Sequence, residues 1–245
     1  MRVWITRSEP GATRLANHLA PLGYDCRLAP LIDIHPTHEA PPTGRFEHVI
    51  FLSEHAVSCA FEQGASVAER AQWYAIGPAT AAALESNRRP TALPVITPAG
   101  AASGASDSSD SSEGLLELPM LAAVQNQRVL VVAGEGGRDT LVTELRKRGA
   151  RVERWCVYRR ALLQSQTLTP KARDVCIASS AAVLEALVEK WLGAGGELSA
   201  PICVPSQRVA QQAKQLGWTQ VWVSDGPAPA AVAATLLDVA ANKDC

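Results

Sequence analysis

The chain has 245 residues, of which 47% are apolar and 19% are charged, with a formal net charge of −1. This length fits two domains and allows sizeable cores, and the near-neutral charge argues against a nucleic-acid partner. No apolar run approaches the roughly 20 residues of a membrane-spanning helix. The start, MRVWITRSEP, lacks the apolar stretch of a signal peptide, and the six cysteines stand singly. Both features predict a cytoplasmic protein with no disulfide framework and no membrane contact.

Short apolar runs alternate with amphipathic helical patterns along the chain. The runs are rich in β-branched residues, which is typical of strands covered on both faces. Helical patterns occupy Thr13–Leu22, Leu141–Arg148 and Val183–Trp191. The alternation predicts an α/β fold with mostly parallel sheets. The predicted strands are Val3–Thr6, Cys26–Ile34, Val49–Leu52, Trp73–Ile76, Val95–Thr97, Val129–Ala133, Val152–Tyr158, Val175–Ala178, Ile202–Val204 and Val221–Val223.

One segment, Pro98–Gly114, departs from this alternation. It reads PAGAASGASDSSDSSEG, so its residues are small and mostly polar. It has no periodicity that would bury one face of a helix or strand. We therefore predict a flexible loop here.

The chain also contains an internal repeat at a shift of 126 positions. Arg2–Gly23 falls on Arg128–Gly149 without a gap, and Val49–Val57 falls on Val175–Val183. Such self-similarity predicts two similar α/β units. A ligand held in a cleft between two such units would face the loops at the carboxyl ends of both sheets.

The stretch VVAGEGGRDTL predicts a strand, a glycine-rich turn and a helix. Gly134 and Gly136 match a dinucleotide fingerprint, but Asp139 stands at the third glycine position, and no Walker A lysine follows. One interpretation is purely structural, a tight turn with Asp139 or Thr140 near a helix N-cap. The other is that backbone N–H groups from Gly136 to Asp139, with Arg138 beside them, bind an anion at the start of the helix.

Similar strand-to-helix junctions recur along the chain. Each hydroxyl residue alone is explained as a helix cap. These four junctions and the glycine turn at Gly136 make five, and together they would line a cleft with N–H groups, hydroxyls and arginines. Such a cleft suits a ligand with many carboxylates and needs no metal. The five histidines show no metal-ligand spacing. The junction residues are Ser53, Gly77, Thr80, Ser179, Ser180, Ser206 and Arg208.

The sequence contains, in this order, RVWITR, LAPLIDI, VIFLSEHAV, GPATAAAL, SSEGLLELPML, GEGGRDTL, RGARVERWCVYRR, CIASSAAVLEAL and VPSQRVAQQAKQLG. In this order the segments resemble the uroporphyrinogen-III synthase family, and the resemblance covers essentially the whole chain. The most specific segments are GPATAAAL and GEGGRDTL followed by RGARVERWCVYRR. Two departures occur: Leu52 stands where the family often has Thr, and VPSQR stands where some members have a second G-P-x-T.

The resemblance implies an enzyme of haem and tetrapyrrole biosynthesis without a cofactor. This hydro-lyase would close the linear tetrapyrrole hydroxymethylbilane, invert its last pyrrole ring and release water. The implied fold has two similar parallel-sheet, flavodoxin-like domains with a cleft between them, joined by a two-strand linker. Domain A would contain residues 1–35 plus 163–245 and domain B residues 39–160, with crossing strands near 28–36 and 154–162.

Tyr158 resembles the family's tyrosine in V-Y-R and is our candidate proton donor to the departing hydroxyl. A structural tyrosine that anchors the linker is an equally good interpretation, and water could donate the proton. We expect a monomer that receives its substrate from hydroxymethylbilane synthase. The alternative is a non-catalytic two-domain module that binds a polycarboxylate or tetrapyrrole. The expected substrate contacts are Thr6, Arg7, Ser53, Gly77, Thr80, Gly136, Gly137, Arg138, Ser179, Ser180, Ser206 and Arg208.

Overall fold

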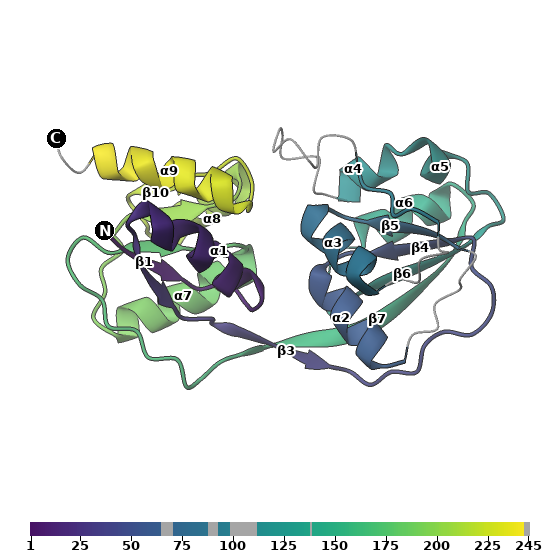
Figure 1. The fold of residues 1–245 in the computed structure, drawn as a ribbon, viewed down its shortest axis with the longest axis horizontal. Helices are drawn as coiled ribbons and strands as arrows, with labels where there is room; N and C mark the ends of the chain where they lie inside the picture. Colours follow the sequence, from purple (N-terminus) through teal and green to yellow (C-terminus); the bar gives the residue numbers. More distant parts are fainter. Residues whose placement is uncertain (65–70, 88–92, 99–111, 138, 243–245) are drawn as a thin grey trace. The chain divides into compact units, whose positions relative to one another are not determined.

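The computed structural model shows two compact α/β units. Unit 1 contains Met1–Asp33 and Ala161–Cys245, and unit 2 contains Ile34–Arg160. The structure contains two five-stranded sheets, and helices flank each of them (Figure 1). Within the described residues, no helix has the length and apolar character needed to cross a membrane. The described residues are 1–64, 71–87, 93–98, 112–137 and 139–242.

The sheet of unit 1 has the strand order β10-β9-β8-β1-β2. Every neighbouring pair in it is parallel. Strands β8 and β9 are buried along their whole length, which explains why all of their residues are apolar. The strands are β1 (Arg2–Ile5), β2 (Asp25–Leu28), β8 (Val175–Ile177), β9 (Ile202–Val204) and β10 (Val221–Val223).

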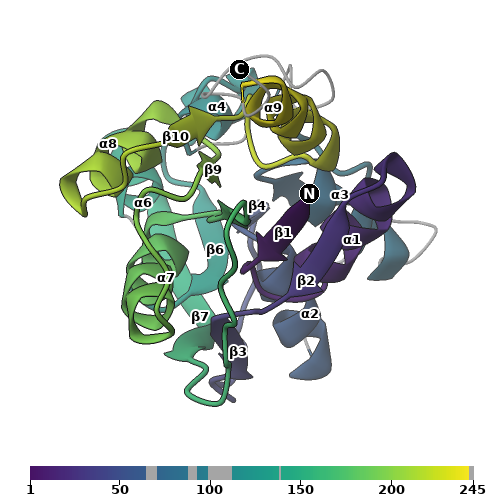
Figure 2. The ribbon, with the colours of Figure 1, turned by 90° about the vertical axis from the view of Figure 1, so that its left-hand side faces the viewer.

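Helices cover both faces of this sheet (Figure 2). Successive side chains of a strand point to opposite faces. Accordingly, Val3 and Ile5 of β1 share one core with α1 and α9, whereas Trp4 shares the other core with α7 and α8. The helical elements are α1 (Gly11–Leu19), the 3-10 turn η1 (Ala20–Leu22), α7 (Ala181–Gly193), α8 (Gln207–Gln215) and α9 (Pro229–Ala241).

The second sheet has the order β3-β7-β6-β4-β5. Strands β4 to β7 pair in parallel. Beside β7 the chain runs antiparallel, because the N–H of Thr37 bonds to the carbonyl of Val157 and the N–H of Leu163 to that of Leu31. The strands are β3 (Ile32–Pro36), β4 (His48–Phe51), β5 (Gln72–Ala75), β6 (Arg128–Gly134) and β7 (Arg151–Leu162).

Unit 2 also has a core on each face of its sheet. Helices α2 and α3 pack against Phe51, Val132 and Trp155, and α4, α5 and α6 pack against Ile50 and Val131. The mostly parallel α/β fold predicted from the sequence is therefore confirmed. The helices are α2 (Glu54–Glu62), α3 (Pro78–Asn87), α4 (Ser112–Leu116), α5 (Pro119–Ala122) and α6 (Thr140–Lys147).

Three predicted segments differ from the structure. The single strand predicted at Cys26–Ile34 is wrong, because the chain forms β2 and β3 with Pro30, which has no N–H to donate, between them. The strand predicted at Val95–Thr97 is reduced to one parallel bridge between Tyr74 and Ile96. Of the predicted loop Pro98–Gly114, residues 99–111 lie outside the described residues, and its last three residues begin α4.

A buried carboxylate ties the segment before β8 to β1. Asp174 accepts hydrogen bonds from Arg2 Nε at 2.8 Å and Trp4 Nε1 at 2.7 Å, and from the N–H of Lys171 at 2.9 Å. Burial acts to raise the pKa of Asp174, but the hydrogen bonds from Arg2 and Trp4 and the Arg2 charge outweigh it, so the pKa lies below its ordinary value. Asp174 is therefore ionised and paired near neutral pH.

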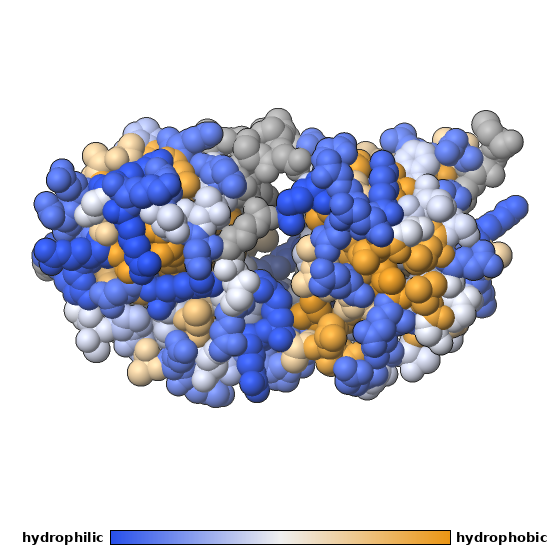
Figure 3. Space-filling view, turned by 180° about the vertical axis from the view of Figure 1, so that it is seen from behind, coloured by the Kyte–Doolittle hydropathy of each residue, from blue (hydrophilic) through white to orange (hydrophobic). Residues whose placement is uncertain are grey.

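Apolar side chains also reach the surface. Figure 3 shows patches of apolar residues on the part of the view that unit 1 occupies. More than half of the surface of a folded protein is contributed by apolar atoms, so we assign these residues no binding role. The exposed large apolar residues of unit 1 include Leu22, Leu28, Leu162, Leu192 and Leu237.

Candidate functional site

In unit 2, the predicted site residues follow the carboxyl ends of parallel strands. Ser53 follows β4, Gly77 follows β5 and Gly136 follows β6. Since β5, β4 and β6 are parallel neighbours, these three positions share one edge of the sheet. Ser53 caps α2, with its Oγ accepting the N–H of Ala56 at 3.0 Å. The predicted cap is thus confirmed.

Thr80 lies differently from the other predicted residues of unit 2. It belongs to α3 and is only 4% exposed. The carbonyl of Gly77, at the start of that helix, accepts the N–H of Ala81. The low exposure of Thr80 places its side chain inside the unit.

Tyr158, from β7, joins this edge through its hydroxyl group. Its Oη lies 3.1 Å from Ser53 Oγ and accepts a hydrogen bond from Arg160 Nη2 at 3.0 Å. The His55 ring lies edge-on with its centre 5.8 Å from that of the tyrosine. Tyr158 is only 1% exposed. A hydroxyl, a guanidinium and an imidazole thus surround one phenol.

The ring of Tyr158 rests on the backbone of Gly134. A β-carbon built on Gly134 would lie 2.5 Å from Tyr158 Cε2 and Cζ and 2.9 Å from its Oη. Contacts this short do not occur between non-bonded carbon atoms, so any larger residue would displace the ring. Gly134 therefore permits the observed position of Tyr158.

Arg154, from β7, holds the two ends of the glycine turn after β6. Its Nη1 donates to Asp139 Oδ1 at 2.6 Å and its Nη2 donates to the carbonyl of Gly134 at 2.9 Å. Gly136 has a φ of +68°, a backbone conformation that favours glycine. Among the described residues, none accepts a hydrogen bond from the N–H of Gly136 or Gly137.

The start of α6 matches only part of what the sequence predicts. Asp139 occupies the N-cap position, but its side chain makes no capping hydrogen bond and pairs with Arg154 instead. Arg138 lies outside the described residues. The N–H groups of the turn and the neighbouring guanidinium of Arg154 make this a candidate anion site.

Unit 1 repeats the arrangement of hydroxyl residues at its own sheet edge. Ser180 caps α7 and Ser206 caps α8, accepting the N–H groups of Val183 and Val209. Both predicted caps are confirmed. Thr6, directly after β1, is fully buried and donates its hydroxyl hydrogen to the carbonyl of Ile177 at 2.6 Å.

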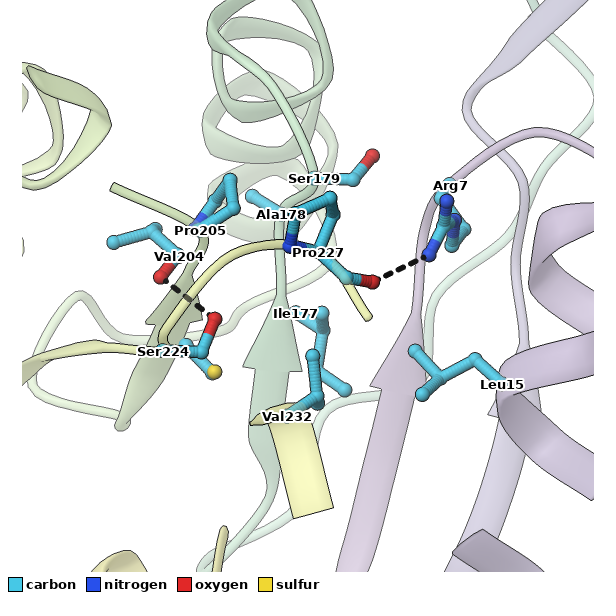
Figure 4. A pocket seen from close by; sticks show the side chains of 11 residues that line it. Arg7, Leu15, Ile177, Ala178, Ser179, Val204, Pro205, Ser224, Pro227 and Val232 are labelled. Carbon is cyan, nitrogen blue, oxygen red and sulfur yellow. Dashed lines mark hydrogen bonds between the residues drawn. The ribbon is translucent and has the colours of Figure 1, made fainter. Parts of the chain in front are cut away.

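A small cavity of about 10 Å³ lies at this edge, beside Arg7 and Ser179 (Figure 4). This is room for one water molecule. Arg7 Nη1 reaches the carbonyl of Pro227 at 3.2 Å, and Ser224 Oγ lies 3.2 Å from the carbonyl of Val204. Arg208 is exposed in the first turn of α8. Each unit therefore brings its own predicted residues to the carboxyl edge of its sheet.

Comparisons with known proteins decide the family. The model of the family described as uroporphyrinogen-III synthase HemD matches residues 13–234. The chain belongs to the uroporphyrinogen-III synthase family. The predicted resemblance is confirmed, and family membership makes the chain an enzyme of tetrapyrrole biosynthesis. The comparisons give no support to a non-catalytic binding module.

Individual uroporphyrinogen-III synthases agree with this assignment. The Escherichia coli enzyme is 28% identical, with 92% of this chain and 95% of that protein covered. The Proteus mirabilis enzyme is 32% identical over 66% of this chain and 82% of that protein. The solved structure of uroporphyrinogen-III synthetase from Helicobacter pylori is 16% identical with a TM-score of 0.64, covering 97% of this chain and 98% of that one. This structural likeness supports the fold.

Three residues beside the predicted site were not predicted from the sequence: His55, Arg154 and Arg160. A signal existed for Arg160, because side chains alternate along a strand and Tyr158 and Arg160 are two residues apart. The same rule does not place Arg154, because the pairing of β7 with β6 shifts between Cys156 and Tyr158. No comparable signal exists for His55, because α2 carries it to the ring.

Proposed function

We propose that the enzyme closes hydroxymethylbilane into uroporphyrinogen III with loss of water and inversion of the last pyrrole ring. The observation that carries the proposal is the hydroxyl of Tyr158 between Ser53 and Arg160, next to a glycine turn whose N–H groups at Gly136 and Gly137 bond to none of the described residues. The phenol supplies a proton where one hydroxyl must depart. The turn supplies donors for carboxylates.

In the proposed reaction, Tyr158 donates its proton to the hydroxyl of the substrate as the carbon–oxygen bond breaks. The leaving group departs as water, and the electron-rich pyrrole stabilises the cation that remains. The last ring then attacks through its substituted carbon, passes through a spiro intermediate and closes in the inverted sense. Closure releases one proton, which restores Tyr158. The enzyme contributes mainly by holding the flexible chain in the geometry for this attack.

Substrate carboxylates are proposed to bind at the carboxyl edges of both sheets. Main-chain N–H groups, hydroxyls and arginines are suitable partners for them. Several weak contacts of this kind also make the loss of any one tolerable. The proposed binding residues are Thr6, Arg7, Ser53, Gly77, Thr80, Gly136, Gly137, Arg138, Ser179, Ser180, Ser206 and Arg208.

The product isomer tests this function. Hydroxymethylbilane is made in situ by its own synthase, this protein is added, and the oxidised porphyrins are separated into types I and III. Closure without the enzyme gives type I, so a type III excess that grows with enzyme concentration is the expected result. Type I alone would refute the proposal.

We also propose that the enzyme works in the cytoplasm as a monomer that receives its substrate from hydroxymethylbilane synthase. The isolated cysteines support this compartment, since the described ones are all free. Sedimentation at micromolar concentration should give a single species of about 26 kDa. A stable dimer would contradict the monomer.

A further inference from the structure

The hydroxyl proposed as proton donor is covered. Tyr158 is 1% exposed, yet a proton donor has to touch its substrate. Gly134 supports the ring through the backbone at the end of β6, and Ser53 is fixed as the cap of α2. Arg160 differs from both because it is itself exposed and reaches the phenol only with the end of a long side chain. His55 meets the ring edge-on and is half-buried on α2. Arg160 is therefore the most exposed neighbour and the one most free to move.

We propose that Arg160 is a removable cover of Tyr158 that a carboxylate of the substrate draws away on binding. This inference rests on the proposed function. Arg160 Nη2 donates to Tyr158 Oη at 3.0 Å, and its guanidinium carbon lies 5.3 Å from the ring centre. An exposed group that bonds to a buried hydroxyl lies on its solvent side.

The exchange of partners follows from hydrogen-bond strength. The phenol is a neutral acceptor that takes one guanidinium N–H. A carboxylate carries a negative charge and accepts two guanidinium N–H groups in parallel, so its bidentate pair with an arginine is stronger than one hydrogen bond to a neutral phenol. A carboxylate that reaches Arg160 therefore competes successfully with Tyr158 for the guanidinium.

Ser53 keeps the uncovered phenol in place. Its Oγ accepts the N–H of Ala56 at 3.0 Å and lies 3.1 Å from Tyr158 Oη. With Arg160 withdrawn, Tyr158 keeps this one partner and turns its freed side toward the substrate. The donor is then presented only when a carboxylate lies near the reacting end of the chain, which ties proton donation to substrate recognition.

The accessibility of Tyr158 can be measured without reference to activity. Tetranitromethane nitrates accessible tyrosine rings, and mass spectrometry of peptides separates the three tyrosines. Tyr24 is half-buried and Tyr74 is fully buried, so they serve as reactive and unreactive standards. Arg160→Ala should make Tyr158 react several-fold faster. The matched control is Arg159→Ala, because Arg159 is exposed and its side chain points to the opposite face of β7.

Steady-state kinetics separate a cover from a group that assists the chemistry. Arg160→Ala should raise KM roughly tenfold or more through the lost contact to a carboxylate, while kcat stays near that of the wild type. Arg160→Lys should recover part of the loss in KM because it keeps the charge. The Arg159→Ala control should change neither constant.

Two results would overturn the inference. One is an unchanged nitration rate of Tyr158 in Arg160→Ala, and the other is a fall in kcat at constant KM. Should Tyr74 become reactive as well, the variant has unfolded, and Arg160→Gln replaces it with the same two outcomes. The isomer formed by the wild type tests the proposed function separately. If the wild type makes type III but Arg160→Ala does not change the nitration rate of Tyr158, only the role of Arg160 as a cover is refuted.

Discussion

Replacing Gly134 with alanine should damage the site through one contact. The added methyl group would start 2.5 Å from two ring carbons of Tyr158, whereas non-bonded carbons prefer about 3.5 Å or more, so the ring must withdraw by about 1 Å. Overpacking of this kind costs about 1–3 kcal/mol of folding free energy. A displacement of about 1 Å at a reacting group lowers activity on the order of 10²-fold. Urea unfolding and the initial rate of type III formation measure the two effects.

Two comparisons isolate that contact. Gly23→Ala adds a methyl group at a φ of +87° with no atom within 4 Å, so it should cost about 1–2 kcal/mol through backbone strain and leave the rate unchanged. In a Tyr158→Ala background, the new methyl group at Gly134 has room, and its cost in stability should largely disappear. If Gly134→Ala were equally destabilising with and without the tyrosine ring, the ring would not be the reason for the glycine.

Other substitutions test the remaining parts of the site and one part of the fold. Tyr158→Phe should lower the rate of type III formation on the order of 10²-fold but leave it measurable, because water can also donate a proton; a dead variant would contradict this. Gly136→Val should cost still more, since a branched side chain resists the positive φ of the turn and blocks an anion; an unchanged KM would exclude an anion site there. Arg154→Gln should loosen the same turn and raise KM about tenfold, as measured by steady-state kinetics. The lowered pKa of Asp174 means that its stabilisation is complete above its unfolded pKa of about 4 and is lost as the pH falls through the folded value. Asp174→Asn should therefore lower the free energy of unfolding at pH 7 by about 3 kcal/mol and flatten the acid limb of the urea-midpoint profile; an unchanged profile would mean that the carboxylate does not hold this segment.

The sheets could be predicted from the sequence because their strands are short, apolar and β-branched. Strand β6 reads RVLVVAG and is buried along nearly all of its length, which is the pattern of a covered parallel strand. The same rule failed at Cys26–Ile34, where the apolar character continues across Pro30. It failed again at Val95–Thr97, which makes a single bridge and stands between Pro94 and Pro98, two residues that have no N–H to donate to a ladder. Apolar character alone does not locate the ends of strands.

The candidate site could be predicted only in part, for a related reason. Capping serines are signalled locally, by the position of a hydroxyl residue between a strand and a helix. Arg154 and Asp139 are 15 residues apart. Their contact depends on how β7 pairs with β6, and the sequence does not show that register. The pair of Arg2 and Asp174 spans 172 positions and joins two distant segments of the chain. No local pattern indicates either pair.

The internal repeat explains why the proposed proton donor occurs in only one unit. At the shift of 126 positions, β2 and β3 correspond to β7, Pro30 stands at the position of Cys156, and Ile32 stands at that of Tyr158. Ile32 is 6% exposed and belongs to the core of unit 1 that contains Trp4. The duplicated framework therefore retains junctions that suit carboxylates in both units, whereas the phenol and its arginine stand in only one copy. In the proposed reaction, a substrate with many carboxylates and a single hydroxyl to lose requires repeated binding groups and one proton donor, which is the division between the two copies.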